Sequence, residues 1–481
     1  MSAFRFVLPA AGAHARSARA AASADRAGWL FAYDWDRDAL QRLQQTIALD
    51  HAGFDLFRFP SNTRLIGFDL ERFATRVAAA GRRHGWQAVL SHHEQFGALA
   101  AALVAEQLGL PGASPESICA AQHKLHARRV LQRVAPEANL AFAALEIEPG
   151  EPPPPGIDYP RFAKPVKAAF SVLAREVGCD ADLVQLTQFS ARERWVIEHL
   201  LAPFERVCRA RLPQAGSAHC LLLEVPVPQS VPQFNLDGWV HDGAVHALGV
   251  VDAVMVPGTR AFMRWEVPSR LPAVVQARAL DVARRFLQAI DYRSGFFNLE
   301  FFYDAAADRL SVIECNPRLA SQFGDLYRRV LGADPHAMAL ALAQGNDPAR
   351  VPRAQPTAGA AASLVYRAQT PAEVRRQPGA AQRAEFARAF PDGLLFGFAK
   401  HGHALQRDFK WTGSHRYGIV HLGGEDRDDL RARAELASAL LGWPAPYLDA
   451  RTTEAAATTA PTAPEPAAAW VAAPRDLLQA G

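Results

Sequence analysis

The residues best suited to chemistry lie in the segment 296–322, FFNLEFFYDAAADRLSVIECNPRLASQ. Two runs rich in β-forming residues flank the polar turn DAAADR, and this pattern predicts an antiparallel hairpin. If the turn is centred near Ala307, Glu300 lies directly opposite Glu314. Because side chains alternate between the two faces of a strand, Glu300, Glu314 and Asn316 are predicted to share one face.

Two like charges held about 5 Å apart on neighbouring strands repel each other, so the pair requires a cation or a shared proton. Two carboxylates and an amide suit Mg²⁺, which takes its remaining ligands from water and nucleotide phosphates. Arg318, in the sequence NPR that follows, can present a bidentate cation to an anion held there. This combination favours phosphoryl transfer. The alternative interpretation is a hairpin whose acidic face is exposed and merely solvated.

The segment 28–118 must be organised around a different pattern, because apolar strand-like runs alternate there with amphipathic helical ones. Such alternation predicts βαβ units and a parallel sheet with helices on both faces. Within it we expect a helix over 36–51, a strand over 54–60 and a helix over 69–85. Turn and helix-capping residues in LPGASPES end this first domain.

The segment 119–350 is predicted to be an α+β block that contains the acidic hairpin. A helix carrying Lys124 opens the block, and the proline run of 148–156 is expected to form an extended connector. Short strands, a hairpin turn at HDGAV and two helices, near 272–290 and 335–343, complete the pattern.

The remainder of the chain contains one further folded segment. A strand, an Asp-rich helix start and an amphipathic helix within 355–450 predict a small C-terminal domain. Residues 1–27 and 451–481 have little to bury and are expected to be disordered tails, with an organelle-targeting segment as the alternative for the first. The predicted fold class is therefore multidomain, combining α/β and α+β parts.

Composition excludes several functional classes. A net charge of +3 and a charged fraction of 21% lack the concentrated basic surface that nucleic-acid binding requires. The 5 cysteines are odd in number and scattered, which favours a reducing cytoplasm over a disulfide framework or a zinc site. Charged or polar residues interrupt every apolar run before the roughly 20 residues that a membrane span needs, so no membrane partner is expected.

The hairpin resembles a motif of the ATP-grasp superfamily, in which an acidic strand is followed by the sequence E-x-N-P-R. Here the motif reads Glu300, then Glu314 to Arg318. The resemblance covers roughly 28–448 and implies an ATP-grasp architecture. It further implies that Glu300, Glu314 and Asn316 hold one or two Mg²⁺ ions, which Mn²⁺ could replace. Arg318 would contact the transferred phosphoryl group or the acceptor.

Two lysines extend the resemblance. The family places one lysine on a helix after LGLPG-x-S and another in a strand reading K-P, and Lys124 and Lys164 match these positions. Both are implied to bind ATP phosphates, Lys164 as a catalytic residue beside Arg318. The loop that follows is glycine-rich in relatives but reads Lys167-Ala-Ala-Phe-Ser171 here. This departure puts ATP affinity and turnover in doubt, and Ser171 is a weaker match to a phosphate contact.

The run CLLLEVPVPQ resembles the family's adenine-binding strand. By this resemblance Glu224 accepts the adenine amino group and the backbone of Val227 contacts the ring. The histidines His92, His93, His241 and His246 are expected to be satisfied locally by neighbours rather than to act as ligands.

The implied function is an ATP- and Mg²⁺-dependent ligase that joins a small-molecule carboxylate to an amine through an acyl phosphate. A homodimer is possible. One alternative is a biotin-carboxylase-like enzyme that uses bicarbonate, although no biotin-attachment segment is visible in the sequence. An alternative of another class is a sensor that binds ATP without turnover, because the loop after Lys164 lacks glycine.

Overall fold

The computed structural model describes residues 25–56, 61–146, 150–168 and 172–448. Contacts between Cα atoms divide the chain into two units, Met1–Pro446 and Tyr447–Gly481, and every element below belongs to the first. Ser171 lies outside the described residues. Across the described ranges, no helix is both long enough and apolar enough to cross a membrane.

The N-terminal part is a parallel sheet, as the alternating pattern predicts. Its order is β2-β1-β3, with bounds β1 (Arg26–Leu30), β2 (Ala48–Ala52) and β3 (Ala88–Leu90). The helices that cover it are α1 (Arg37–Leu43), α2 (Leu70–His84), α3 (Gly97–Leu108) and α10 (Pro335–Ala343). Apolar side chains of α2 and α3 pack on one face of the sheet, and those of α1 and α10 pack on the other.

Three boundaries in this part were predicted wrongly. The helix expected over 36–51 ends at Leu43, and β2 lies at 48–52, within that range. Of the strand expected over 54–60, residues 54–56 belong to no strand, and residues 57–60 lie outside the described residues. β-Branched Thr46 and Ile47 disfavour helix, and pairing with β1 draws the following residues into the sheet. The first strand also begins at Arg26, two residues inside the predicted tail of 1–27.

A four-stranded antiparallel sheet follows in the order β4-β7-β5-β6. Its strands are β4 (Phe142–Leu145), β5 (Arg161–Pro165), β6 (Arg175–Val177) and β7 (Leu221–Glu224), and its helices are α4 (Pro115–Gln122), α5 (Lys124–Val134), α6 (Asp180–Thr187) and α7 (Ala191–Arg211). The prediction of only two helices in this block missed α6 and α7. A capping box between Ser190 and Glu193 starts α7, whereas Pro203 inside the helix obscures its pattern.

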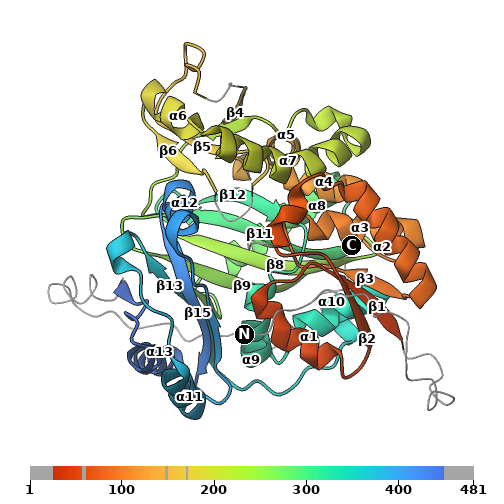
Figure 1. Ribbon diagram of the computed structural model, residues 1–481, viewed down its shortest axis with the longest axis vertical. Helices are drawn as coiled ribbons and strands as arrows, with labels where there is room; N and C mark the ends of the chain where they lie inside the picture. Colours follow the sequence, from red (N-terminus) through yellow and green to blue (C-terminus); the bar gives the residue numbers. More distant parts are fainter. Residues whose placement is uncertain (1–24, 57–60, 147–149, 169–171, 449–481) are drawn as a thin grey trace. The chain divides into compact units, whose positions relative to one another are not determined.

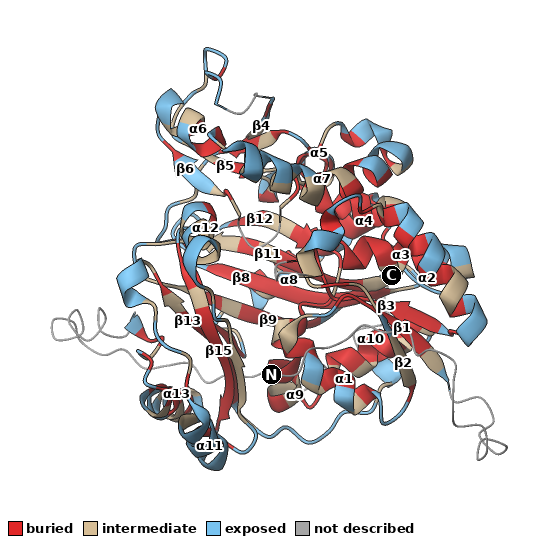
Figure 2. Cartoon of the chain, in the orientation of Figure 1, coloured by how far each residue is buried: buried red, intermediate tan, exposed pale blue. Residues whose placement is uncertain are grey.

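An eight-stranded sheet carries the acidic hairpin, with the order β12-β11-β8-β9-β10-β13-β15-β14 (Figure 1). The bounds are β8 (Gln233–His241), β9 (Ala244–Met255), β10 (Phe262–Val267), β11 (Gly295–Asp304), β12 (Arg309–Asn316), β13 (Ala360–Ala368), β14 (Leu394–Gly397) and β15 (His415–Gly424). The strands β13, β14 and β15 of the predicted C-terminal domain thus continue the sheet of the central block. Figure 2 shows that β8, at the interior of this sheet, is buried over nearly its whole length.

The remaining helices are α8 (Ala273–Ala289), α9 (Gly324–Leu331), α11 (Ala380–Ala389), α12 (Gly402–Thr412) and α13 (Arg427–Leu441). The positions of α8 and α10 match the prediction, whereas α9 was missed. The HDGAV turn joins β8 to β9 as predicted, with Asp242 and Gly243 both at positive φ. This turn matches the right-handed twist of the two strands.

Candidate functional site

The β11–β12 hairpin brings the predicted acidic residues together. Glu300 lies opposite Glu314, as a turn centred near Ala307 predicts. Asn316 Nδ2 donates a hydrogen bond to Glu300 Oε1 at 3.2 Å, so both side chains occupy one face. A bulge between Glu300 and Phe301 shifts the rest of the register by one residue and leaves Ile313 without a ladder partner.

Glu300 lies in a setting that opposes its negative charge. It is half-buried, and its second carboxylate oxygen accepts a hydrogen bond from Gln233 Nε2 at 2.8 Å. Burial first, and then the charge of Glu314, raise the pKa of Glu300 well above its usual range. The carboxyl group therefore holds a proton unless a cation compensates it, which excludes a merely solvated acidic face.

Lys124 supplies one of the cations near the hairpin. It is the first residue of α5, and its Nζ lies 3.2 Å from Glu314 Oε2 and donates to the Ala168 carbonyl at 2.8 Å. Burial alone would raise the pKa of Glu314, but the charges of Lys124 and Lys164 outweigh it and lower that pKa. The two facing carboxylates thus differ, because Glu314 is ionised while Glu300 favours its proton.

Lys164 and Arg128 form a second buried cluster on the four-stranded sheet. Glu224 Oε2 lies 2.9 Å from Lys164 Nζ, and Glu224 Oε1 lies 2.6 Å from Arg128 Nε. Both cations also donate to the Ile313 carbonyl at 3.2 Å, the carbonyl that the hairpin bulge exposes. These bonds tie the four-stranded sheet to the hairpin. Burial would raise the pKa of Glu224, but Arg128 and Lys164 lower it.

Arg318 forms an ion pair with Glu94, a residue of the N-terminal part of the fold. Its guanidinium nitrogen lies 2.5 Å from Glu94 Oε2, and both side chains are largely buried. The backbone N–H of Glu94 donates to the Tyr33 hydroxyl at 3.0 Å. Burial would lower the pKa of Arg318, but the charge of Glu94 raises it, so the guanidinium is permanently charged. Glu94 follows β3, where parallel strands commonly present ligand-binding side chains.

The hairpin residues fit a divalent cation bound together with a nucleotide. Glu300 and Glu314 supply hard oxygens, and burial and the charge of Glu314 raise the pKa of Glu300, an effect that a bound cation would oppose. The Lys124 ammonium lies 3.2 Å from Glu314, and the Lys164 ammonium lies 3.2 Å from the Ile313 carbonyl beside it. Among the described residues no group of three or more His, Cys, Asp or Glu side chains could hold a metal by itself. Such a donor set is typical of a cation that shares its coordination with phosphate oxygens.

Two residues of the loop after Lys164 and of the predicted adenine-binding segment, Lys167 and Val227, lie within the described part of the chain. Lys167 is buried, with Nζ 3.5 Å from the Glu94 carbonyl and 5.0 Å from the centre of the Phe204 ring. Burial lowers the pKa of Lys167 to about 8. The Val227 carbonyl accepts a hydrogen bond from the Arg260 guanidinium, in the segment after β7.

The expectation that His92 and His93 are satisfied locally was wrong. Both are buried, and His92 Nε2 and His93 Nδ1 have no hydrogen-bond partner within the described part of the chain. Burial lowers the pKa of each to about 3, so both are neutral. Their rings pack instead against aromatic neighbours, His92 on Trp29 and His93 on Tyr33.

Two site residues were missed from the sequence. Arg128 follows Lys124 by four positions, so both lie on one face of α5, and this spacing could have identified it. Glu94 lies four residues after the end of β3 and is separated from Arg318 by 224 positions. Its place at the end of a parallel strand was the available signal.

Comparison with known proteins gives matches of fold only. No family model and no curated protein sequence matches the chain. Among solved structures, the L-amino acid ligase from Bacillus licheniformis is similar, with a TM-score of 0.61 and 14% identity, over 86% of this chain and 96% of that one.

Two other solved structures contain nucleotides. Carboxyaminoimidazole ribonucleotide synthase from Aspergillus clavatus, complexed with ATP, has a TM-score of 0.56 and 15% identity, over 87% of this chain and 98% of that one. The biotin carboxylase domain of the Hydrogenobacter thermophilus 2-oxoglutarate carboxylase, in complex with MgADP and bicarbonate, has a TM-score of 0.55 and 12% identity, over 88% and 91%. The predicted ATP-grasp fold is therefore confirmed.

Proposed function

We propose that this chain is an ATP- and Mg²⁺-dependent ligase that activates a small-molecule carboxylate as its acyl phosphate and joins it to an amine. The observation that carries the proposal is the facing pair Glu300 and Glu314, with Lys124 beside it. The amine belongs to an amino acid or a similar small molecule. The products are an amide, ADP and phosphate.

Each side chain has a role in binding or in charge stabilisation. Lys124 and Lys164 bind phosphate oxygens of ATP, and Arg318 binds the transferred phosphoryl group or the acceptor. Positioning and electrostatic stabilisation supply the rate acceleration, so no covalent enzyme nucleophile is needed. Two hairpin acids, Glu300 and Glu314, together with the Asn316 amide, would hold one or two Mg²⁺ ions. When bound, Mg²⁺ neutralises phosphate charge, and Mn²⁺ is proposed as a substitute.

Both bond changes occur between substrates. A carboxylate oxygen bonds to the γ-phosphorus of ATP while the bond from that phosphorus to its bridging oxygen breaks, which releases ADP. The amine nitrogen then bonds to the acyl carbon, loses a proton and displaces phosphate. Because the acyl phosphate is easily hydrolysed, the chain must exclude water from it.

The adenine site is proposed at the end of β7. Glu224 accepts the adenine amino group, and the backbone of Val227 contacts the ring. Lys164 and Arg128 each occupy one oxygen of Glu224, and an ionised carboxylate oxygen has two acceptor positions. Glu224 therefore retains capacity for a further donor.

Two alternative functions are distinguishable from the ligase. The similarity to a biotin carboxylase domain bound to bicarbonate favours a bicarbonate-dependent enzyme as the second candidate. A sensor that binds ATP without turnover is favoured only by the glycine-poor loop that begins at Lys167. A cytoplasmic location and a homodimer are proposals as well, and the five free cysteines are compatible with the location.

The test is ADP release by the full chain with MgATP and pools of amino acids or bicarbonate. Dependence on amino acids supports the ligase, dependence on bicarbonate supports the carboxylase, and binding of MgATP without ADP release supports the sensor. Glu314→Gln should abolish turnover and leave the circular dichroism spectrum unchanged. The matched control is Glu198→Gln, at an exposed glutamate of α7, which should retain full activity. An E314Q protein as active as the parent would refute the metal assignment.

A further inference from the structure

Two arginines face each other on the strands that extend the central sheet beyond β10. Arg367 of β13 is the direct ladder partner of Arg416 of β15. Within the described ranges, no carboxylate oxygen lies at ion-pair distance from either guanidinium. Two like charges directly opposite each other destabilise a strand pair, so this arrangement requires an anion that the described residues do not supply.

The surroundings of Arg416 leave its hydrogen-bond donors available. Its guanidinium carbon lies 4.6 Å from the centre of the Phe398 ring and 5.5 Å from that of Trp35. Contact with aromatic faces fixes the plane of a guanidinium without using its N–H groups. Arg416 makes no hydrogen bond with the described chain, whereas Arg367 donates to the Ser414 hydroxyl at 2.9 Å.

Asp408, the acid whose charge acts most strongly on this pair, is already engaged. Asp408 lies 2.8 Å from Lys400 Nζ and 2.9 Å from His415 Nδ1. Burial, which Asp408 only partly offsets, lowers the pKa of Arg416 to about 10, and burial together with the charge of Arg416 lowers that of Arg367 to about 9. Both groups stay charged at neutral pH, and within the described residues neither guanidinium forms an ion pair with a carboxylate.

A continuous set of contacts joins the arginine pair to the candidate site. Trp35 stacks on Tyr33 with ring centres 4.5 Å apart. The Tyr33 hydroxyl accepts from the Glu94 N–H, and Glu94 pairs with Arg318. The order of charges from the phosphoryl-transfer residues outward is therefore positive at Arg318, negative at Glu94 and positive at Arg416.

We propose that Arg416 and Arg367 bind an anionic group, carboxylate or phosphate, on the substrate that supplies the amine. The proposal rests on the ligase function proposed above. The order of charges is complementary to such a substrate, because its amine lies toward Glu94 while its anion lies against the arginines. The chemical class of the acceptor is thus an amine that also carries a carboxylate or phosphate, as a free amino acid does.

The first experiment measures ADP release by the full chain with MgATP and three pools: free L-amino acids, the same amino acids as α-amides, and phosphorylated amines such as phosphoethanolamine. One anionic pool should support turnover, with kcat/KM at least tenfold above that of the amides. In Arg416→Met, KM for the active pool should rise at least tenfold with little change in kcat. The dissociation constant of MgADP, measured by calorimetry, should change less than twofold.

The matched control is Arg433→Met on α13. Arg433 is also half-buried and lies 5.4 Å from the centre of the Phe390 ring. It has no opposed arginine, so R433M should keep the parent KM. Arg416→Lys retains the charge but loses the planar group. Its KM for the active pool should therefore lie between those of R416M and the parent. Amides that serve as well as the acids, or an R416M protein with the parent KM, would overturn the proposal while leaving the ligase intact.

The second experiment decides the outcome if no pool releases ADP. The melting temperature of the MgADP-loaded chain is measured in acetate or inorganic phosphate, against chloride at equal ionic strength. One of these anions should stabilise the parent and R433M, and that shift should be at least halved in R416M. Equal shifts in all three proteins would refute anion binding. Failure of turnover with the shift retained would refute only the ligase function.

Discussion

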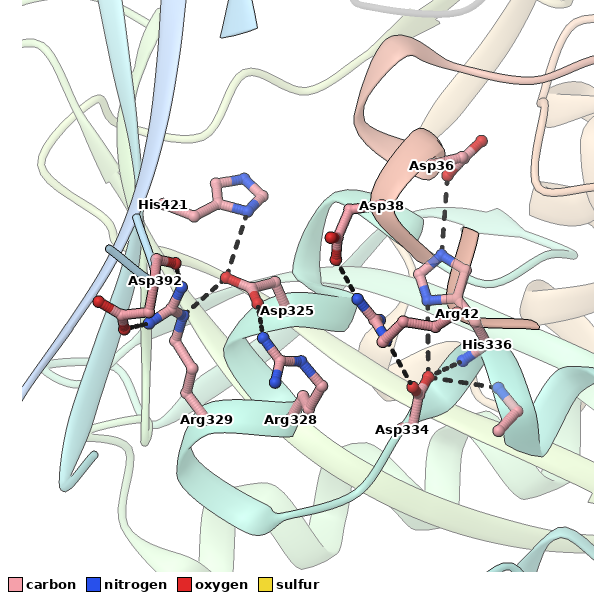
Figure 3. A network of polar contacts seen from close by, with 11 residues as sticks. Asp36, Asp38, Arg42, Asp325, Arg328, Arg329, Asp334, His336, Asp392 and His421 are labelled. Atoms are coloured by element: carbon pink, nitrogen blue, oxygen red, sulfur yellow. Dashed lines mark hydrogen bonds and ion pairs between the residues drawn. The ribbon is translucent and has the colours of Figure 1, made fainter. Parts of the chain in front are cut away.

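Around Asp325 the chain buries charges that compensate one another, whereas across the β11–β12 hairpin it opposes charges of the same sign. Asp325 lies 2.7 Å from Arg329 and 2.8 Å from Arg328, with His421 at 3.7 Å (Figure 3). Arg329 also contacts Asp392. Burial would raise the pKa of Asp325, but Arg329 and its neighbours lower it.

The hairpin lacks this balance. Glu300 has only neutral hydrogen-bond partners, Gln233 and Asn316, and its pKa is raised by burial and by Glu314. A cluster that compensates itself holds the fold together and needs no ligand. A cluster with an uncompensated charge destabilises the fold, and a bound ligand of opposite charge compensates it. The two kinds of cluster should therefore respond in opposite ways to removal of a charge.

The largest effect is expected from Arg329→Met in the balanced cluster. Arg329 is almost fully buried, and its loss leaves Asp325 as a buried charge with weaker compensation. Removal of one partner of a buried pair costs about 3–5 kcal/mol. Urea unfolding should show this loss, while kcat at a permissive temperature should stay near the parent value. An unchanged unfolding curve would show that Arg329 contributes little to the fold.

Glu300→Gln should have the opposite profile. Loss of one charged group that stabilises the reacting phosphates is expected to lower kcat by about 10²–10³, equivalent to about 3–4 kcal/mol. The metal-free variant should melt no lower than the parent, because the Glu300 carboxyl holds a proton without a cation and the substitution replaces one neutral group with another. Steady-state ADP release and thermal melting measure the two quantities. A variant that is both active and less stable would show that Glu300 stabilises the fold and does not act in catalysis.

Asp237, a third buried carboxyl group, extends the comparison to a site with neutral hydrogen-bond partners. Asp237 accepts hydrogen bonds from Tyr327 at 2.7 Å and Asn298 at 2.9 Å, and burial raises its pKa to about 6. Between the unfolded pKa near 4 and the folded pKa, the folded state holds a proton that the unfolded state has released. Stability is therefore lost as pH rises through this window, by roughly 2–3 kcal/mol.

The measurement for Asp237 is the free energy of unfolding of the parent relative to Asp237→Asn at pH 4 and pH 7. The parent should be less stable relative to the variant at pH 7 than at pH 4, because only the parent has a carboxyl group that titrates at this position. A difference independent of pH would show that Asp237 keeps its ordinary pKa.

The smallest effect is expected from Mg²⁺ in the absence of nucleotide. A ligand at ten times its dissociation constant stabilises the state that binds it by about 1.4 kcal/mol. Mg²⁺ should raise the melting temperature of the parent slightly and should have no effect on Glu300→Gln. Ca²⁺-free buffer and a Na⁺ control at equal ionic strength separate this shift from general salt effects. An equal shift in parent and variant would contradict binding at Glu300.

Local pattern predicted much of the geometry of the candidate site. A turn centred near Ala307 placed Glu300 opposite Glu314, and the strand period of two, which backbone geometry fixes, placed Asn316 on the same face. The bulge after Glu300 was not predictable, since it depends on how the neighbouring strands pack. The family resemblance pointed to Lys124, and the same face of α5 carries Arg128, which was not noticed.

Contacts between distant segments were beyond the sequence. Nothing local to Glu94 indicates Arg318, and nothing local to Arg367 indicates Arg416, because each pair forms only when separate elements pack together. Helix α7 was missed because its capping box is a weak signal beside an interior proline. A single sequence thus predicts which side chains meet within one helix or hairpin. It does not predict which side chains meet when separate elements pack together.

The continuous sheet from β12 to β14 constrains how the protein can be shortened. Because β13 pairs with β10, a chain truncated near residue 355 would expose the full hydrogen-bonding edge of β10. Such an edge is a template for strand addition by another molecule, so truncated versions should self-associate. The C-terminal strands therefore cover an edge of the sheet that carries the candidate site, and deletion of this segment should cause aggregation before an effect on function can be measured.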